Sequence, residues 1–263
     1  TLAYYAQLGA SLPATRHLVD GDGMQLGRTS RFWGQHVFVP RPGVALHINA
    51  FNFPAWGMGE KMACALLAGV PVIEKAGTAS ALLAFRIAQI VVQSGLLPEG
   101  AFQFVAGSAS GLLDLLGPMD AVAFTGSAAT GVLIRGNKNL VARNVRVNIE
   151  ADSINPAVLG PDVEPGGDTF EQFLANVATD MTQKAGQKCT AVRRIFVPSP
   201  RVAEVEEALV ERLRAVKIGN PADNDVRMGP VASSEQLRDV RQGIQRLQAV
   251  SDTVLGVPQA IAE

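Results

Sequence analysis

The chain has 263 residues, of which 48% are hydrophobic and 18% are charged, and its formal net charge is -1. This composition can bury a large core and excludes an intrinsically disordered chain. The balance of charges gives no electrostatic basis for binding nucleic acid or an anionic membrane surface. No apolar run reaches the ~20 residues that a membrane-spanning helix needs. We therefore expect a globular protein without a nucleic-acid or membrane partner.

The cysteine content and the N-terminal residues indicate the cellular compartment of the protein. The 2 cysteines and 3 histidines are too few for a disulfide framework or a zinc site, so no metal is expected. Free cysteines are typical of a reducing compartment, and we expect a cytoplasmic location. Residues 1–5 do not begin a signal peptide. The sequence does not start with Met, which favours a fragment or a chain that lacks its start.

The N-terminal region predicts a β-hairpin. A turn-rich stretch, residues 20–31, separates two short β-like runs at residues 17–19 and 37–39. Such runs joined by turn residues are typical of a hairpin, here a short β arm. The sequence shows no apolar partner for this arm. We therefore expect it to pack on another subunit of a homo-oligomer, most simply a dimer.

From residue 44 onwards, apolar strands alternate with helical segments. Strands are predicted at residues 44–48, 70–74, 102–105, 121–124 and 145–149, with helices at 56–68, 78–94, 110–116 and from 128. This alternation is typical of βαβ units, which build a parallel sheet with right-handed connections. The fold class is therefore predicted to be α/β.

The pattern restarts after Glu150, where we place the domain boundary. Strands are predicted at residues 157–159 and 194–197, and helices at 169–184, from 199, and at 233–247. Ser199 followed by Pro200 is a typical helix start, because serine caps a helix and proline fits its first turn. Residues 151–263 are therefore predicted to form a second α/β domain.

Four short motifs carry the functional signal, and they occur in this order: residues 50–54 (AFNFP), 124–127 (FTGS) with Gly131, 148–150 (NIE) and 186–190 (GQKCT). Together they resemble the aldehyde dehydrogenase superfamily over essentially the whole chain. Residues 150–153 (EADS) and 184–194 (KAGQKCTAVRR) are most similar to the branch that oxidises CoA-linked semialdehydes in aerobic phenylacetate or benzoate degradation. The resemblance implies a Rossmann-like coenzyme domain over residues 1–150 and an incomplete catalytic domain over 151–263.

Cys189 is the predicted nucleophile. It lies in a polar loop between a predicted helix and a predicted strand, with no apolar period around it. Addition of a thiolate to an aldehyde gives a tetrahedral intermediate that can expel hydride. The other cysteine, Cys64, lies in an apolar helix and is expected to be a buried structural residue.

The resemblance implies two further catalytic residues. Glu150 would be the general base that activates water to release the acid, a role that favours a buried carboxylate. Asn52, with the backbone N–H of Cys189, would stabilise the oxyanion. The plainer alternatives are a strand-end carboxylate and a turn asparagine. Residues 151–153 (ADS) depart from the hydrophobic residue and two glycines that follow this Glu in most of the family.

The residues that predict coenzyme binding lie in turns that follow strands. The G-x-G-x-x-G fingerprint is absent, but residues 124–127 run from a strand through a tight turn into a helix, whose N-terminus suits a pyrophosphate. By resemblance, Gly126 and Ser127 line this site. Gly107 would lie beside the adenosine, and a plain turn glycine is the alternative.

The resemblance also bears on the coenzyme type. Lys75 matches a lysine that binds the adenosine ribose, although a solvated strand-end lysine is the alternative. Thr78 stands where NAD-preferring members carry a glutamate that binds both ribose hydroxyls. Without that carboxylate a 2′-phosphate is not repelled, so we expect NADP to be preferred and NAD to be accepted. Glu74 is expected to point to the other face of the strand.

The resulting prediction is oxidation of an aldehyde substrate, most simply a CoA-linked semialdehyde, through a thiohemiacetal and a thioester. One alternative is a CoA-acylating aldehyde dehydrogenase, against which Glu150 argues. Another is a catalytically silent, truncated nucleotide-binding fragment. That alternative is favoured, for this chain though not for its parent, by the expected lack of the C-terminal half, which includes the segment whose Glu holds the nicotinamide ribose and the strand that pairs subunits. The helical segment before the arm is expected to be absent as well.

Overall fold

The computed structural model describes residues 1–256, and the chain divides into two compact units, Thr1–Ala151 and Asp152–Glu263. Residues 257–263, which belong to the predicted catalytic domain, lie outside the described residues. Within the described part of the chain, no helix is both long enough and apolar enough to cross a lipid bilayer.

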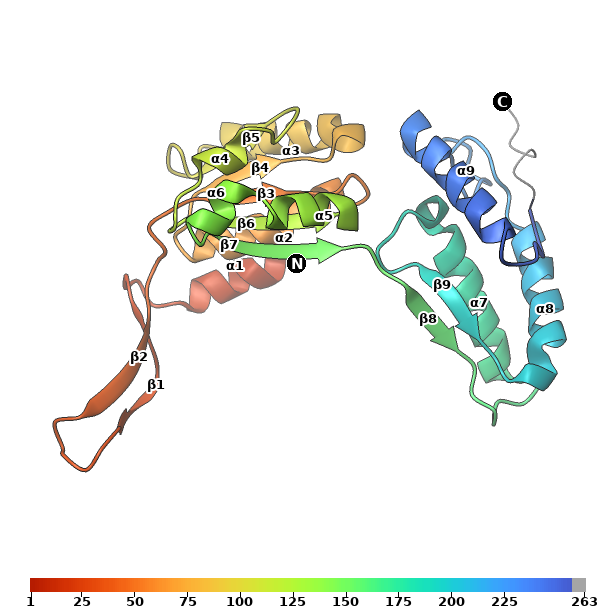
Figure 1. Cartoon of the computed structure of the whole chain (residues 1–263), viewed down its shortest axis with the longest axis horizontal. Helices are drawn as coiled ribbons and strands as arrows, with labels where there is room; N and C mark the ends of the chain where they lie inside the picture. Colours follow the sequence, from red (N-terminus) through yellow and green to blue (C-terminus); the bar gives the residue numbers. More distant parts are fainter. Residues whose placement is uncertain (257–263) are drawn as a thin grey trace. The chain divides into compact units, whose positions relative to one another are not determined.

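A five-stranded parallel sheet forms the centre of the first unit (Figure 1). Its strands are β3 (Ala45–Ile48), β4 (Val72–Lys75), β5 (Phe102–Val105), β6 (Ala121–Gly126) and β7 (Arg146–Ala151). Their order is β5-β4-β3-β6-β7, and every neighbouring pair is parallel. The first strand is central and the chain then moves outwards on each side in turn, which is the doubly wound arrangement. The predicted Rossmann-like α/β class is confirmed.

Helices cover both faces of this sheet. One face packs on α2 and α3 through a cluster that contains Met58, Val72, Ala88 and Phe102. The other face packs on α4, α5 and α6 through a larger buried cluster. These helices are α2 (Pro54–Leu67), α3 (Ala81–Gln93), α4 (Leu112–Leu115), α5 (Ala128–Arg135) and α6 (Lys138–Ala142). Burial on both faces is complete at the central strand β3, whose four residues are all buried, whereas the edge strand β7 alternates between exposed and half-buried residues.

The N-terminal arm is the predicted hairpin, formed by antiparallel strands β1 (Leu18–Gln25) and β2 (Trp33–Phe38). Several of its large apolar side chains are exposed, among them Met24, Trp33 and Phe38. A helix, α1 (Leu2–Ser11), precedes the arm, so the expected lack of a helical segment there is wrong. Helix α1 has a weak amphipathic pattern, because it contains no charged residue and buries none of its side chains.

Two predicted helices are divided in the structure. The helix expected at residues 78–94 begins as a 3₁₀ turn, η1 (Thr78–Ser80), before α3. The helix expected from residue 128 ends at Arg135, and α6 follows after Gly136 and the capping residue Asn137. Both divisions shorten the helices without changing which face of the sheet they cover.

The second unit contains a parallel strand pair, β8 (Asn155–Val158) and β9 (Val192–Phe196), together with three α-helices within the described residues. These helices are α7 (Asp168–Thr182), α8 (Val202–Arg214) and α9 (Ser234–Gln248). The core consists of Leu159, Phe170, Leu174 and Val205. A 3₁₀ turn, η3 (Ser199–Arg201), precedes α8 at the predicted helix start. Strand β9 follows the Cys189 loop and contacts β8 and α7.

Candidate active site

The predicted site residues of the first unit gather at one edge of the parallel sheet. The carboxyl ends of parallel strands meet at the same edge, and open α/β sheets bind ligands there. Each strand contributes: Asn52 follows β3, Lys75 and Thr78 lie at and after the end of β4, Gly107 follows β5, Gly126 and Ser127 lie at the end of β6, and Glu150 lies near the end of β7. The structure therefore brings these residues of the first unit to a common edge.

The loop with Asn52 is braced against the loop with Thr78. Asn52 is half-buried, in the turn that ends at Pro54, the first residue of α2. The hydroxyl of Ser80 donates a 2.7 Å hydrogen bond to the backbone oxygen of Phe51. A Cβ on Gly77 would lie 2.5 Å from the backbone nitrogen of Phe51, which is too close for any side chain. The two loops therefore pack backbone against backbone, and position 77 requires glycine.

Glu150 is exposed, which corrects the expectation of a buried carboxylate. The reason is its position, because β7 is an edge strand of the sheet. Thr125 on the neighbouring strand is its register partner, and the Thr125 hydroxyl donates to Oε2 of Glu150 over 3.3 Å. The carboxylate is therefore oriented by a neighbouring strand.

Lys61 is a residue of this edge that the sequence analysis missed. Its Nζ donates to Oγ1 of Thr125 over 2.6 Å and also to Oδ1 of Asn49. Burial lowers the pKa of Lys61 below its usual range, and the carboxylates of Glu74, Glu60 and Glu150 oppose that shift. The available signal was one lysine within the apolar segment that forms α2.

Glu74 continues this polar network into the interior. It is fully buried, and its Oε1 accepts a 2.6 Å hydrogen bond from Nδ2 of Asn49. Its Oε2 lies 3.7 Å from Nδ1 of His47, and neither atom has a hydrogen-bond partner among residues 1–256. Hydrogen bonds thus run without a break from Glu74 through Asn49, Lys61 and Thr125 to Glu150.

The turn between β6 and α5 has the form expected of an anion site. Gly126 ends β6, and Ser127 is the exposed N-cap of α5, with its hydroxyl accepting from the backbone N–H of Thr130 over 3.3 Å. Gly107 is also exposed, and its φ of 99° lies in the region that favours glycine. A Cβ there would meet nothing within 4 Å, so the backbone conformation alone explains this glycine.

Lys75 and Thr78 follow the buried part of β4. Lys75 is the last residue of the strand and is half-buried, and its backbone oxygen accepts a 2.9 Å hydrogen bond from the N–H of Asn49. Thr78 is exposed and opens the 3₁₀ turn η1. Both positions are therefore held by backbone contacts near the sheet edge, while the Thr78 side chain is open to solvent.

Cys189 belongs to the second unit, whereas Asn52 and Glu150 belong to the first. It is exposed, in the loop between the 3₁₀ turn η2 (Gln183–Gly186) and β9. Its backbone oxygen accepts hydrogen bonds from the Ser153 hydroxyl and from Nδ2 of Asn155, the latter at 2.6 Å. The loop is therefore anchored through its backbone, and the thiol stays accessible to a reactant.

Cys64 is also exposed, so the expectation of a buried structural cysteine is wrong. Its thiol donates to the hydroxyl of Tyr5 over 2.9 Å. This hydrogen bond is the main cause that raises the pKa of Tyr5. The residue lies on the side of α2 that meets α1, and the contact with Tyr5 leaves it exposed.

Comparison with known proteins identifies the family. The sequence pattern of the aldehyde dehydrogenase family matches residues 5–258 of this chain. The chain belongs to the aldehyde dehydrogenase family. One curated member of this family, 3,4-dehydroadipyl-CoA semialdehyde dehydrogenase of Aromatoleum evansii, is 46% identical over 97% of the chain and 50% of its own length. Alpha-ketoglutaric semialdehyde dehydrogenase of Bacillus subtilis is 34% identical over 74% of the chain and 39% of its own length.

Solved aldehyde dehydrogenases share the fold. Betaine aldehyde dehydrogenase of Staphylococcus aureus, in complex with NAD+, superposes with a TM-score of 0.79 at 25% identity, covering 94% of this chain and 46% of that one. A mutant of aldehyde dehydrogenase C of Pseudomonas syringae, complexed with NAD+ and octanal, superposes with a TM-score of 0.81 at 25% identity. The match covers 99% of this chain and 51% of that one. The chain spans about half the length of the curated relatives it matches.

Proposed function

We propose that this aldehyde dehydrogenase oxidises a CoA-linked semialdehyde to the carboxylic acid with a nicotinamide coenzyme. The observation that carries the proposal is the 46% identity, over 97% of the chain, to a CoA-semialdehyde dehydrogenase. It is supported by the gathering of the predicted site residues at one sheet edge. In this proposal residues 1–150 bind the coenzyme, and residues 151–263 form the first part of the catalytic domain. The exposed apolar side chains of the β arm would pack on a second copy of the protein.

The sheet edge fits a nicotinamide dinucleotide. The turn from half-buried Gly126 to exposed Ser127 leads into a helix N-terminus, which suits a pyrophosphate. Lys75 would bind the adenosine ribose, and Gly107 would border the adenosine. When bound, the coenzyme supplies the acceptor for the hydride that leaves the substrate.

The catalytic steps are assigned to three residues. The thiolate of Cys189 adds to the aldehyde carbon and forms a thiohemiacetal, whose oxyanion accepts hydrogen bonds from the Asn52 side chain and the Cys189 N–H. Loss of hydride from that carbon leaves a thioester. Glu150 takes a proton from water, the resulting hydroxide attacks the thioester, and the acid leaves as the C–S bond breaks and the Cys189 thiolate is restored. Glu150 then releases its proton to solvent.

The reaction product distinguishes hydrolysis of the enzyme thioester from transfer of its acyl group to CoA. In the protein that carries this chain, NADP+ reduction should depend on added CoA-linked semialdehyde and should yield the free carboxylate at the former aldehyde carbon. Mass spectrometry of the product, with and without added CoA, is the measurement. Formation of a second CoA thioester, in place of the acid, would contradict the assignment of Glu150 and favour a CoA-acylating enzyme.

Thr78 carries the proposed preference for NADP over NAD. Its exposed hydroxyl can donate to a 2′-phosphate, whereas a glutamate there would accept from the ribose hydroxyls of NAD and repel that phosphate. The similar solved structures named above are NAD+ complexes, which supports the use of NAD as a coenzyme.

Thr78→Glu should move the coenzyme preference towards NAD by about tenfold to hundredfold, as expected for one charge-assisted hydrogen bond of roughly 1.5–3 kcal/mol. The change should appear mainly in KM for NADP. The measurement is kcat/KM for both coenzymes, with Thr78→Gln as the uncharged control. An unmutated protein that already favours NAD would overturn the preference proposed here.

A further inference from the structure

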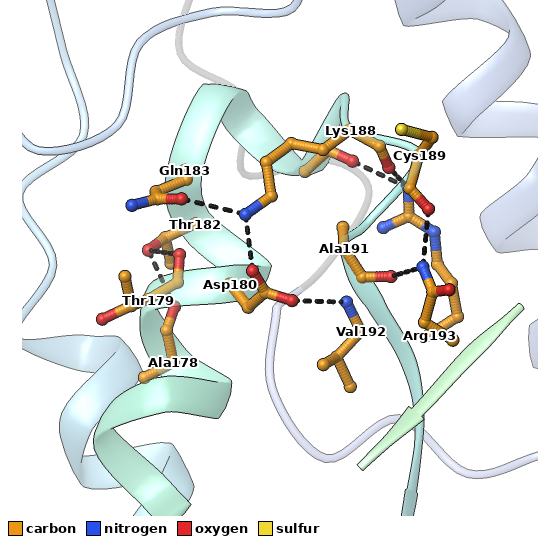
Figure 2. Close-up of polar contacts among 12 residues, drawn as sticks. Ala178, Thr179, Asp180, Thr182, Gln183, Lys188, Cys189, Ala191, Val192 and Arg193 are labelled. Atoms are coloured by element: carbon orange, nitrogen blue, oxygen red, sulfur yellow. Dashed lines mark hydrogen bonds and ion pairs between the residues drawn. The ribbon is translucent and has the colours of Figure 1, made fainter. Parts of the chain in front are cut away.

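The carboxylate of Asp180 contacts the chain both before and after Cys189 (Figure 2). Lys188, directly before Cys189, is only 8% exposed, and its Nζ lies 2.5 Å from Oδ1 of Asp180 on α7. The other carboxylate oxygen, Oδ2, accepts a 3.1 Å hydrogen bond from the backbone N–H of Val192, the first residue of β9. Asp180 therefore connects the residue before Cys189 to the strand that follows it.

The Lys188 side chain is turned away from the thiol. Figure 2 shows its amine pointing towards Asp180 and Gln183, and Nζ donates to Oε1 of Gln183 over 2.9 Å. Within residues 1–256, no hydrogen bond engages the backbone N–H of Cys189. With the carbonyl and both flanks of Cys189 anchored, that N–H keeps one direction and is available to a bound group.

We propose that Asp180 and Lys188 are positioning residues, whose ion pair fixes the Cys189 loop and cancels two charges close to the thiol. This inference rests on the proposed function, in which Cys189 is the nucleophile. Neither side chain touches a reactant, so both act through the backbone and through the electric field at Cys189.

The charges of Lys188 and Asp180 have opposite effects on the Cys189 thiol, and the direction of each effect can be tested. A charge that loses its partner is left uncompensated, in a buried place for Lys188 and in a half-buried one for Asp180. An uncompensated Lys188 cation would favour the Cys189 thiolate, and an uncompensated Asp180 anion would disfavour it. Neutralising one partner should therefore shift thiol reactivity in opposite directions, and neutralising both should restore it.

Other charged groups surround the loop and stay in place in all variants. Desolvation and the charge of Lys188 lower the pKa of Lys184, while Cys189 opposes that shift. Arg193 and Arg194 donate to backbone carbonyls on and beside the loop. Because these groups are common to every variant, a difference in pH midpoint between variants is due to the Asp180–Lys188 pair.

The test is the pH profile of Cys189 alkylation by iodoacetamide, followed by mass spectrometry of the peptide that contains Cys189. Cys64→Ser in every variant leaves Cys189 as the one cysteine of residues 1–263. Asp180→Asn should lower the pH midpoint of the profile and Lys188→Met should raise it. Each shift should be about half to one pH unit, the size expected for one charge several ångströms away at an effective dielectric of roughly 20–40. The double variant should return to the parental midpoint.

Conservative and remote variants give the controls. Lys188→Arg keeps the charge and should retain the parental midpoint. Lys217→Met and Asp225→Asn neutralise an exposed ion pair of the same unit and should leave the midpoint unchanged. Shifts of the same sign in both single variants, or no recovery in the double variant, would overturn the proposal.

A second pair of variants tests the proposal if Lys188→Met does not fold, and a separate variant tests the proposed function. If circular dichroism shows that Lys188→Met does not fold, Asp180→Asn is compared with Asp180→Glu, which keeps the charge. Equal midpoints for these two variants would overturn the proposal. Alkylation requires no turnover, so its outcome is separate from that of the proposed function, whose failure would appear as aldehyde oxidation by a Cys189→Ala variant.

Discussion

Cys189→Ala should reduce aldehyde oxidation to the background rate while coenzyme binding stays near normal. The alanine has no thiolate to add to the carbonyl, so no tetrahedral intermediate that can expel hydride is formed. The coenzyme-binding residues proposed here all lie in the first unit, so they are untouched by the change. Steady-state NADPH formation measures the first effect, and titration of the coenzyme by intrinsic fluorescence measures the second.

Cys64 provides the matched control for this experiment. Both cysteines are exposed, but the Cys64 thiol donates to Tyr5 and lies on α2 away from any loop. Cys64→Ala should retain turnover, and iodoacetamide should label Cys189 before Cys64. Turnover that survives in Cys189→Ala would reject the nucleophile assignment.

Glu150→Gln should lower the steady-state rate by about 10²–10⁴-fold, the usual cost of losing a general base. Glutamine keeps the shape and can still accept from the Thr125 hydroxyl, so the strand pairing at this edge should persist. A rapid burst of NADPH followed by slow turnover is expected, because thioester formation does not need the base that hydrolyses it. Stopped-flow absorbance resolves the two phases.

Glu99→Gln is the control for the loss of one carboxylate, because Glu99 is an exposed loop residue before β5. It should leave both phases unchanged. A steady-state rate for Glu150→Gln equal to that of the unmutated protein would show that another group activates water.

The sequence predicted the elements that have a strong local signal. Strand β5 has the predicted bounds, residues 102–105, because an apolar run between turn residues is readable without tertiary information. The motifs at residues 124–127 and 148–150 likewise fall at strand ends, because each includes residues of β6 or β7. Helix α1 was missed, since it packs on α2 without burying a periodic apolar face.

The contacts that orient the site were not predictable from local patterns. Lys61 and Thr125 are joined by a hydrogen bond across 64 residues of sequence, so no helical or strand period relates them. Asp180 and Lys188 are 8 residues apart and lie on either side of a turn in which Lys184 and Ala185 adopt φ of 53°. Such pairs follow only from how α2, α7 and the strands pack.

The close approach of Gly77 to Phe51 limits how the coenzyme preference of this enzyme can be redesigned. A library that varies residues 76–80 would change the proposed ribose contact and the support of Asn52 together, because Gly77 and Ser80 both meet the backbone of Phe51. Substitutions at 77 or 80 should therefore lower turnover with either coenzyme, whereas Thr78 can be varied alone. Selection for a new coenzyme is expected to keep Gly77 and Ser80 and to concentrate its accepted changes at position 78.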